Sequence, residues 1–160
     1  GVLCFAIVYL FGFLDKSQGA PTFLWVVAAY IPLLLSIGAT TGSQAATVTV
    51  GALRAGKLSS HNLKLHLVKE FRLSLVFVLF FGVLVYLLAQ VFLPNINLSL
   101  LFATAMGLQI SISMILGNVI PILIARIGLD ASVASVPVYA SFADVSAMAV
   151  LFTLLHGMHS

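Results

Sequence analysis

The stretch FRLSLVFVLFFGVLVYLLAQVFL, residues 71–93, decides the fold class of this chain. After Arg72 it carries no charged residue until the break at Pro94-Asn95-Ile96-Asn97. An α-helix needs about 20 predominantly apolar residues to cross the roughly 30 Å hydrocarbon core of a bilayer. The stretch therefore predicts a transmembrane helix.

The composition of the whole chain agrees with a membrane location. Of its 160 residues, 62% are hydrophobic and 7% are charged, whereas a soluble domain has roughly 25% charged residues. The single cysteine, Cys4, excludes an intrachain disulfide and a Cys/His zinc pattern. The net charge of +3 comes from few residues and no nucleic-acid-binding motif accompanies it. We therefore expect an integral membrane protein without a nucleic-acid partner.

Charge-free stretches on both sides of residues 71–93 predict further helices. Full spans are expected over residues 21–50, 98–125 and 131–155, and a shorter apolar segment covers residues 1–14. The short segment cannot cross alone, and we interpret it as part of a truncated helix. A signal peptide is the competing interpretation, although a basic flank and a cleavage site are lacking. The prediction is an all-α membrane bundle with five transmembrane helices per chain, the first short or truncated.

Basic residues predict the orientation of this bundle. They concentrate in the connections after the second and fourth helices, at Arg54, Lys57, Lys64, Lys69, Arg72 and Arg126. The alternate connections hold only Lys16. By the positive-inside rule the basic connections face the cytoplasm. We expect a multi-pass protein of the cell membrane with its N-terminal end inside and its C-terminus outside, and an amphipathic lead-in over residues 58–72 near the inner interface.

The four acidic residues differ in their predicted depth. Asp15, Glu70 and Asp130 lie at helix ends, where water or a neighbouring cation can serve them. Asp144 lies about 20 Å into the last span, at 1.5 Å per residue. An ionised carboxylate at that depth is costly unless it faces a cation or a water-filled cavity. Asp144 therefore marks a cation pathway, and the competing interpretation is a protonated Asp that bonds a neighbouring helix.

Polar and small residues surround this pathway in the predicted helices. One face of the helix over residues 21–50 carries Ser36, Thr40, Ser43, Gln44 and Thr47 at helical spacing. Such stripes can line a pathway or simply pack helices together, and the Gly38–Gly42 pair favours packing. Before Asp144, Pro137 frees the carbonyl of Val133 from its intrahelical bond. A carboxylate beside free carbonyls suits a hard cation.

Enzymatic chemistry is not indicated by these residues. Asp130 and Asp144 lack the signatures of an intramembrane aspartyl protease and would not meet as a dyad. The four histidines lie near predicted interfaces rather than at membrane depth, which argues against a serine-protease arrangement.

Three segments, in order between residues 38 and 145, match one family. The segment Gly42-Ser43-Gln44-Ala-Ala-Thr47 is similar to GNxGxQSxT, Lys69-Glu70 is similar to a KE that opens the third helix, and residues 117–144 are similar to GxxxP…GxDPAxASxP…D. Together they resemble the transmembrane domain of the MgtE magnesium channels, a family that includes the animal solute-carrier 41 proteins. The departures are Thr40 for Asn, Gly51 for Arg, Ala131-Ser132 for Pro after Asp, and Ser146 or Ala147 for Gly.

The resemblance implies a magnesium channel. Asp144 would be the ion-binding carboxylate, which meets its counterpart in a homodimer around hydrated Mg²⁺, and the backbone carbonyl of Ala140 would hold the waters of the ion. Helices two and five would line the pore with Thr40, Ser43, Gln44, Thr47, Pro137 and Ala147. Structural or interfacial roles would fall to Asp130, Glu70 and Arg72.

Several alternatives stay open at this point. A proton- or sodium-coupled divalent cation transporter or exporter could use the same scaffold, and Mn²⁺ or Co²⁺ could accompany Mg²⁺ as the transported ion. We expect residues 1–160 to form a single transmembrane pore domain, with no soluble regulatory domain in this chain. Two explanations stay open: such a domain was removed, or this homologue lacks one.

Overall fold

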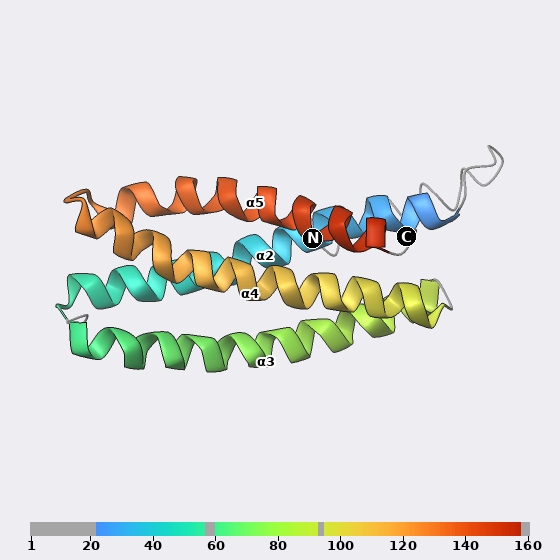
Figure 1. The fold of residues 1–160 in the computed structure, drawn as a ribbon, viewed down its shortest axis with the longest axis horizontal. Coiled ribbons are helices and arrows are strands. Elements are labelled where there is room, and N and C mark those ends of the chain that lie inside the picture. The colour runs from blue at the N-terminus through green and yellow to red at the C-terminus, as the bar shows by residue number, and fades with distance from the viewer. Residues whose placement is uncertain (1–21, 57–59, 93–94, 158–160) are drawn as a thin grey trace.

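The structure, a computed structural model, describes residues 22–56, 60–92 and 95–157. These ranges form four α-helices: α2 (Thr22–Arg54), α3 (Ser60–Phe92), α4 (Ile96–Arg126) and α5 (Ala131–Gly157). The helices run up and down, so that the α2–α3 and α4–α5 connections lie at the same end of the bundle (Figure 1). The all-α prediction is confirmed for the described residues. The partial helix predicted over residues 1–14 lies outside them.

Among the described residues, three helices are long and apolar enough to cross a membrane. The candidate spans are Lys64–Val91, Ile96–Arg126 and Ser135–Leu154. Helix α2, predicted as a full span, is not among them, although its 33 residues give it sufficient length. Serine, threonine and glutamine residues interrupt its apolar character from Ser36 onward.

Two predicted boundaries were wrong, each for a local reason. The break predicted at residues 94–97 is shorter, because Oδ1 of Asn95 accepts hydrogen bonds from the amides of Asn97 and Leu98 at 3.1 and 3.3 Å. An Asn that caps the first free amides lets the helix begin at the next residue. The span predicted to start at residue 71 belongs to a helix that starts earlier, since α3 runs unbroken from Ser60 and contains no proline. From Ser60 onward, the lead-in predicted over residues 58–72 is part of this helix.

Glycines end the two helices whose C-termini lie at the basic end of the bundle. Gly56 and Gly128 have φ angles of 64° and 81°, a region that L side chains rarely adopt. After α4, the amide of Leu129 donates to the carbonyl of Ile124 and the amide of Gly128 to that of Ala125, both at 3.2 Å. This is a Schellman ending, which turns the chain directly toward α5.

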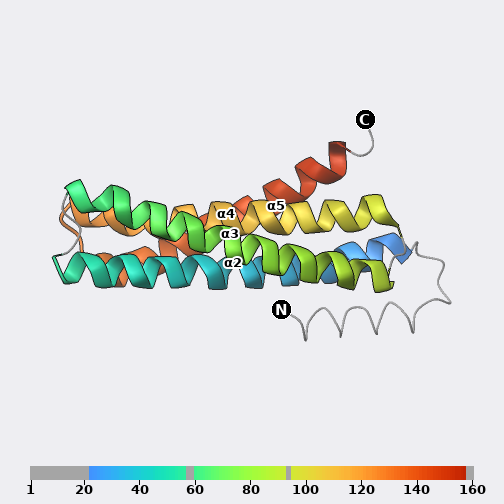
Figure 2. The same cartoon turned by 90° about the horizontal axis from the view of Figure 1, so that it is seen from below.

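Helix α4 lies at the centre of the bundle. It packs against each of the other three helices, and α2 also packs against α5. Half of the α4 span is buried within the chain, against 17% of the α3 span. Helix α3 consequently turns a row of large apolar side chains outward, as expected for a helix that faces lipid. The C-terminal end of α5 stands away from the other helices (Figure 2).

Glycines bring α2 and α4 into backbone contact. A Cβ atom added to Gly117 would lie 2.2 Å from the carbonyl oxygen of Gly42. Tyr139 of α5 fits beside this contact, and its buried hydroxyl donates to the carbonyl oxygen of Gly38 at 2.7 Å. The Gly38–Gly42 pair therefore packs helices together, on the inward side of α2.

Candidate cation site

Asp144 lies on the outward side of α5. The inward side of this helix repeats every four residues and is buried: Tyr139, Ala143, Ala147 and Leu151. Asp144 follows Ala143 by about 100° of helix rotation and is exposed. None of the described residues forms an ion pair with it. Its carboxylate is therefore available to a ligand from outside the chain.

The polar stripe of α2 is also turned outward. Thr40, Gln44 and Thr47 are exposed and Ser43 is half-buried. The glycine pair described above occupies the opposite, buried side of the same helix. Stripe and glycines therefore have separate roles, and helix packing within the chain does not account for the stripe.

The hydroxyl groups on these outward sides present acceptor oxygens. Thr40 donates its proton to the carbonyl of Ser36 at 2.7 Å, and Thr47 donates to that of Ser43 at 2.8 Å. On α5, Ser141 donates to the carbonyl of Pro137 at 3.1 Å. A hydroxyl has a single proton, so only lone pairs remain for an outside ligand. Water molecules around a hydrated cation are hydrogen-bond donors, and this surface suits them.

The other residues predicted to line the pore differ in exposure. Pro137 is exposed and Ala140 is half-buried, on the side of α5 that carries Asp144. Ala147 is fully buried in the hydrophobic core with Phe102 and Leu151. It lies four residues after Ala143 and therefore shares the inward side of α5, so we leave it out of the pore-lining set.

Asp130 joins α5 to the end of α2 rather than to Asp144. It precedes α5 as an N-cap, and its Oδ1 accepts hydrogen bonds from the amide and hydroxyl of Ser132 at 2.8 and 2.6 Å. Arg54 lies 4.0 Å from the same oxygen and also donates to the Ser132 hydroxyl. The Ser132 hydroxyl first, then its amide and the Arg54 guanidinium, hold the pKa of Asp130 below its usual range. The cluster ties together the two helices that carry the acceptor oxygens.

The sequence predicted that Glu70 lies at a helix end, and this prediction was wrong. Because α3 begins at Ser60, Glu70 falls well inside the helix and is only 9% exposed. It points between α3 and its neighbours, where it lines grooves shared with α2 and α4. Arg72, two residues later, is exposed.

A polar network missed by the sequence reasoning links three helices. Thr49 of α2, fully buried, donates to Oδ1 of Asn118 on α4 at 2.6 Å. His66 of α3 lies 3.0 Å from the same hydroxyl through Nε2, and this nitrogen must be the donor because the hydroxyl proton is already used. The signal in the sequence was an amide, Asn118, within a predominantly apolar span. Among the described residues, no three acidic, histidine or cysteine side chains cluster as metal ligands.

Known proteins resemble this chain over most of its length. The chain is 28% identical to the magnesium transporter MgtE of Thermus thermophilus, over an alignment that covers 92% of this chain and 34% of that protein. It is 22% identical to the magnesium transporter MgtE of Bacillus subtilis, with 79% of this chain and 28% of that protein covered. The chain thus spans about a third of the length of these relatives.

The family assignment comes from a match between the chain and a family model. The MgtE family, described as divalent cation transporter, matches residues 31–154. This range includes α3, α4, the polar stripe of α2 and the part of α5 that carries Asp144. The chain therefore belongs to the MgtE family of divalent cation transporters.

Proposed function

We propose that the chain forms one half of a homodimeric pore that conducts hydrated Mg²⁺, with Asp144 as the ion-binding carboxylate. The observation that carries the proposal is the exposure of Asp144 on α5, a helix long and apolar enough to cross a membrane. A carboxylate at membrane depth is retained where it serves an ion pathway. The names of the bacterial relatives favour Mg²⁺ as the ion, with Mn²⁺ and Co²⁺ as further candidates.

Charge supports the pairing of two chains. One carboxylate neutralises half the charge of a divalent ion, whereas two copies related by a twofold axis would supply two. Closed twofold dimers are the commonest oligomers. Mg²⁺ gives up its water reluctantly and is usually held by one or two carboxylates. The acceptor oxygens of Thr40 and Ser141 would then accept hydrogen bonds from the waters of the ion, and the carbonyl of Ala140 would do the same.

The basic residues give this proposed pore a direction in the membrane. Arg54, Lys64 and Arg126 belong to the end of the bundle where α2 and α4 finish. By the positive-inside rule this end lies in the cytoplasm of a cell membrane, and a chain of five spans would then have its C-terminus outside.

Flux measurements on Asp144 variants test the proposal. In liposomes under an imposed potential, Asp144→Asn should reduce Mg²⁺ flux to the level of empty liposomes, because the amide keeps the shape but lacks the charge. The matched control is Asp130→Asn, which removes one charge from the helix cap and should retain flux. Undiminished flux through Asp144→Asn would remove this carboxylate from the mechanism.

A gradient experiment separates a channel from a coupled transporter. A channel should carry Mg²⁺ in response to the potential alone. A coupled transporter or exporter would require a proton or Na⁺ gradient of opposite direction. Flux that appears only when such a gradient is imposed would replace the channel by the coupled mechanism.

A further inference from the structure

Glu70 is a buried carboxylate without a visible partner. Its side chain is only 9% exposed, and its Oε2 atom has no hydrogen-bond partner among the described residues. Its neighbours on α3, Lys69 and Arg72, are exposed, and neither forms an ion pair with it. A buried charge is normally paired or coordinates a metal ion, because desolvation is otherwise uncompensated. The carboxylate therefore lacks a counter-charge from the part of the chain that the structure describes.

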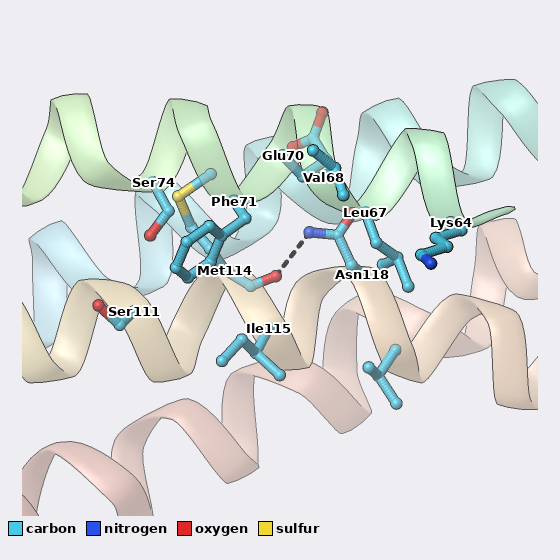
Figure 3. Close-up of a pocket in the computed structure, with 11 residues that line it drawn as sticks. Lys64, Leu67, Val68, Glu70, Phe71, Ser74, Ser111, Met114, Ile115 and Asn118 are labelled. Carbon is cyan, nitrogen blue, oxygen red and sulfur yellow. Dashed lines mark hydrogen bonds between the residues drawn. The ribbon is translucent and has the colours of Figure 1, made fainter.

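Space for an added ion exists on both sides of Glu70. A groove of about 400 Å³ lies between Glu70 and α2, and it is lined by Ser43, Gln44 and Thr47 together with apolar side chains that include Met114 of α4. A second groove of about 530 Å³ lies between α3 and α4, where Lys64, Glu70 and Asn118 line the walls among mostly apolar side chains (Figure 3). Both grooves open to the outside of the bundle. The first groove therefore leaves room for an ion beside the carboxylate.

The α2 side of the first groove offers neutral oxygen donors. The hydroxyl of Thr47 already donates its proton to the carbonyl of Ser43, so its oxygen is left as an acceptor. Gln44 adds an amide carbonyl and Ser43 a hydroxyl. Carboxylate, carbonyl and hydroxyl oxygens are ligands for hard cations.

Charge balance decides which cation fits. Among the residues that the structure describes, Glu70 is the only acidic one that lines either groove, and the described parts of α2 and α4 contribute no charged side chain to them. Lys64 lines the second groove with an exposed side chain that is not paired with Glu70. A monovalent ion neutralises one carboxylate, whereas a divalent ion would leave a buried positive charge. We propose that Glu70, with the oxygens of Ser43, Gln44 and Thr47, forms a second cation site, separate from Asp144, that binds Na⁺.

The site would connect two helices that otherwise have little contact. Helix α3 packs on α4, and its contacts with α2 are sparse. A bound Na⁺ bridges Glu70 of α3 to the polar stripe of α2. If the proposed Mg²⁺ pore is correct, Na⁺ occupancy then fixes the position of a pore-lining helix, but the binding itself does not depend on Mg²⁺ conduction.

Thermal unfolding of the purified protein in detergent tests the binding directly. The midpoint should rise and saturate as NaCl replaces choline chloride at constant ionic strength, because an ion that binds only the folded state stabilises it. The unaltered protein is sufficient for this first experiment. An equal midpoint in Na⁺ and choline would overturn the proposal.

Variants then locate the effect. Glu70→Gln keeps the shape of the side chain and should abolish the Na⁺-dependent rise, while Asp144→Asn should retain it and lose Mg²⁺ flux instead. Should Glu70→Gln fail to fold, Ser43→Ala should raise the half-saturating Na⁺ concentration several-fold. A full Na⁺ response in Glu70→Gln, or a Glu70-dependent response to Mg²⁺ with none to Na⁺, contradicts the assignment. A failure at Glu70 leaves the Asp144 result unaffected, so the two proposals stand or fall separately.

Discussion

Gly117 sets the distance between α2 and α4 by lacking a side chain. The atom that an added Cβ would meet is a backbone oxygen, that of Gly42, at 2.2 Å. A backbone atom within a helix cannot rotate away, so the helices would have to separate. Such overpacking usually costs about 1–3 kcal/mol.

We therefore expect Gly117→Ala to lower the unfolding free energy by at least about 1 kcal/mol. Gly82→Ala is the matched control, since its Cβ would meet only the Ala103 carbonyl at an ordinary 3.9 Å. Thermal midpoints of the two variants in detergent measure the difference. Equal midpoints would show that the α2–α4 contact is looser than the structure indicates.

Two acids of the described helices occupy opposite environments. Asp144 is exposed on the outward side of α5, whereas Glu70 is buried between α3 and its neighbours. From the sequence, Asp144 was predicted to lie at membrane depth and Glu70 at a helix end. Depth along a helix and burial by neighbouring helices are independent, and only the second determines which groups a carboxylate meets.

At the scale of the elements, the N-terminus of α5 predicts a pH dependence. Hydrogen bonds from Ser132, together with Arg54, hold the pKa of Asp130 below its usual range, and the unfolded value is about 3.9. Because the folded pKa is the lower one, the ionised carboxylate stabilises the fold above about pH 3.9, and this contribution is lost as the pH falls through the folded pKa.

The thermal midpoint of the protein should therefore decrease on acidification below about pH 4, and that of Asp130→Asn should decrease less. Asn can still cap the helix, so the variant isolates the charge. Midpoints measured at intervals between about pH 2.5 and pH 6 check this. Parallel curves for the two proteins would exclude Asp130 as a source of the acid sensitivity.

For the whole molecule, the outward sides of α2 and α5 are where the proposed second copy would lie. Ser141 is exposed on α5, one turn before Asp144. In a Cys4→Ser background, Ser141→Cys should form an intermolecular disulfide, because a residue near a twofold axis approaches its own counterpart. Leu79→Cys, at a position that is 68% exposed on the apolar side of α3, is the control that should form no intermolecular disulfide.

Non-reducing electrophoresis of membranes after mild oxidation reads out this cross-linking. A disulfide requires Cα atoms within about 7 Å of each other, so the result is specific for a close axis. Efficient cross-linking of Leu79→Cys without that of Ser141→Cys would place the interface of two copies on α3 and remove Asp144 from it.

Much of the fold could be predicted from the sequence because membrane helices are local. The apolar run at residues 71–93 predicts a helix from neighbouring residues alone. Glycines such as Gly56 and Gly128 commonly follow helix ends. The errors occurred where a single side chain decides the boundary, as with the Asn95 cap. The third span was predicted to start at residue 71 because charged residues were taken to end a span, although they do not end a helix.

The sequence by itself determined the membrane class, the helical fold and the family likeness, and it singled out Asp144 as a candidate, since each depends on composition, spacing or motif. Only the tertiary structure decided which side of each helix is covered. It placed the Thr40–Thr47 stripe outward and the glycines inward, buried Ala147 in the core, and enclosed Glu70 between three helices. The physical reason is that burial arises from contacts between residues far apart in the chain, and a pattern along one helix does not specify its neighbours.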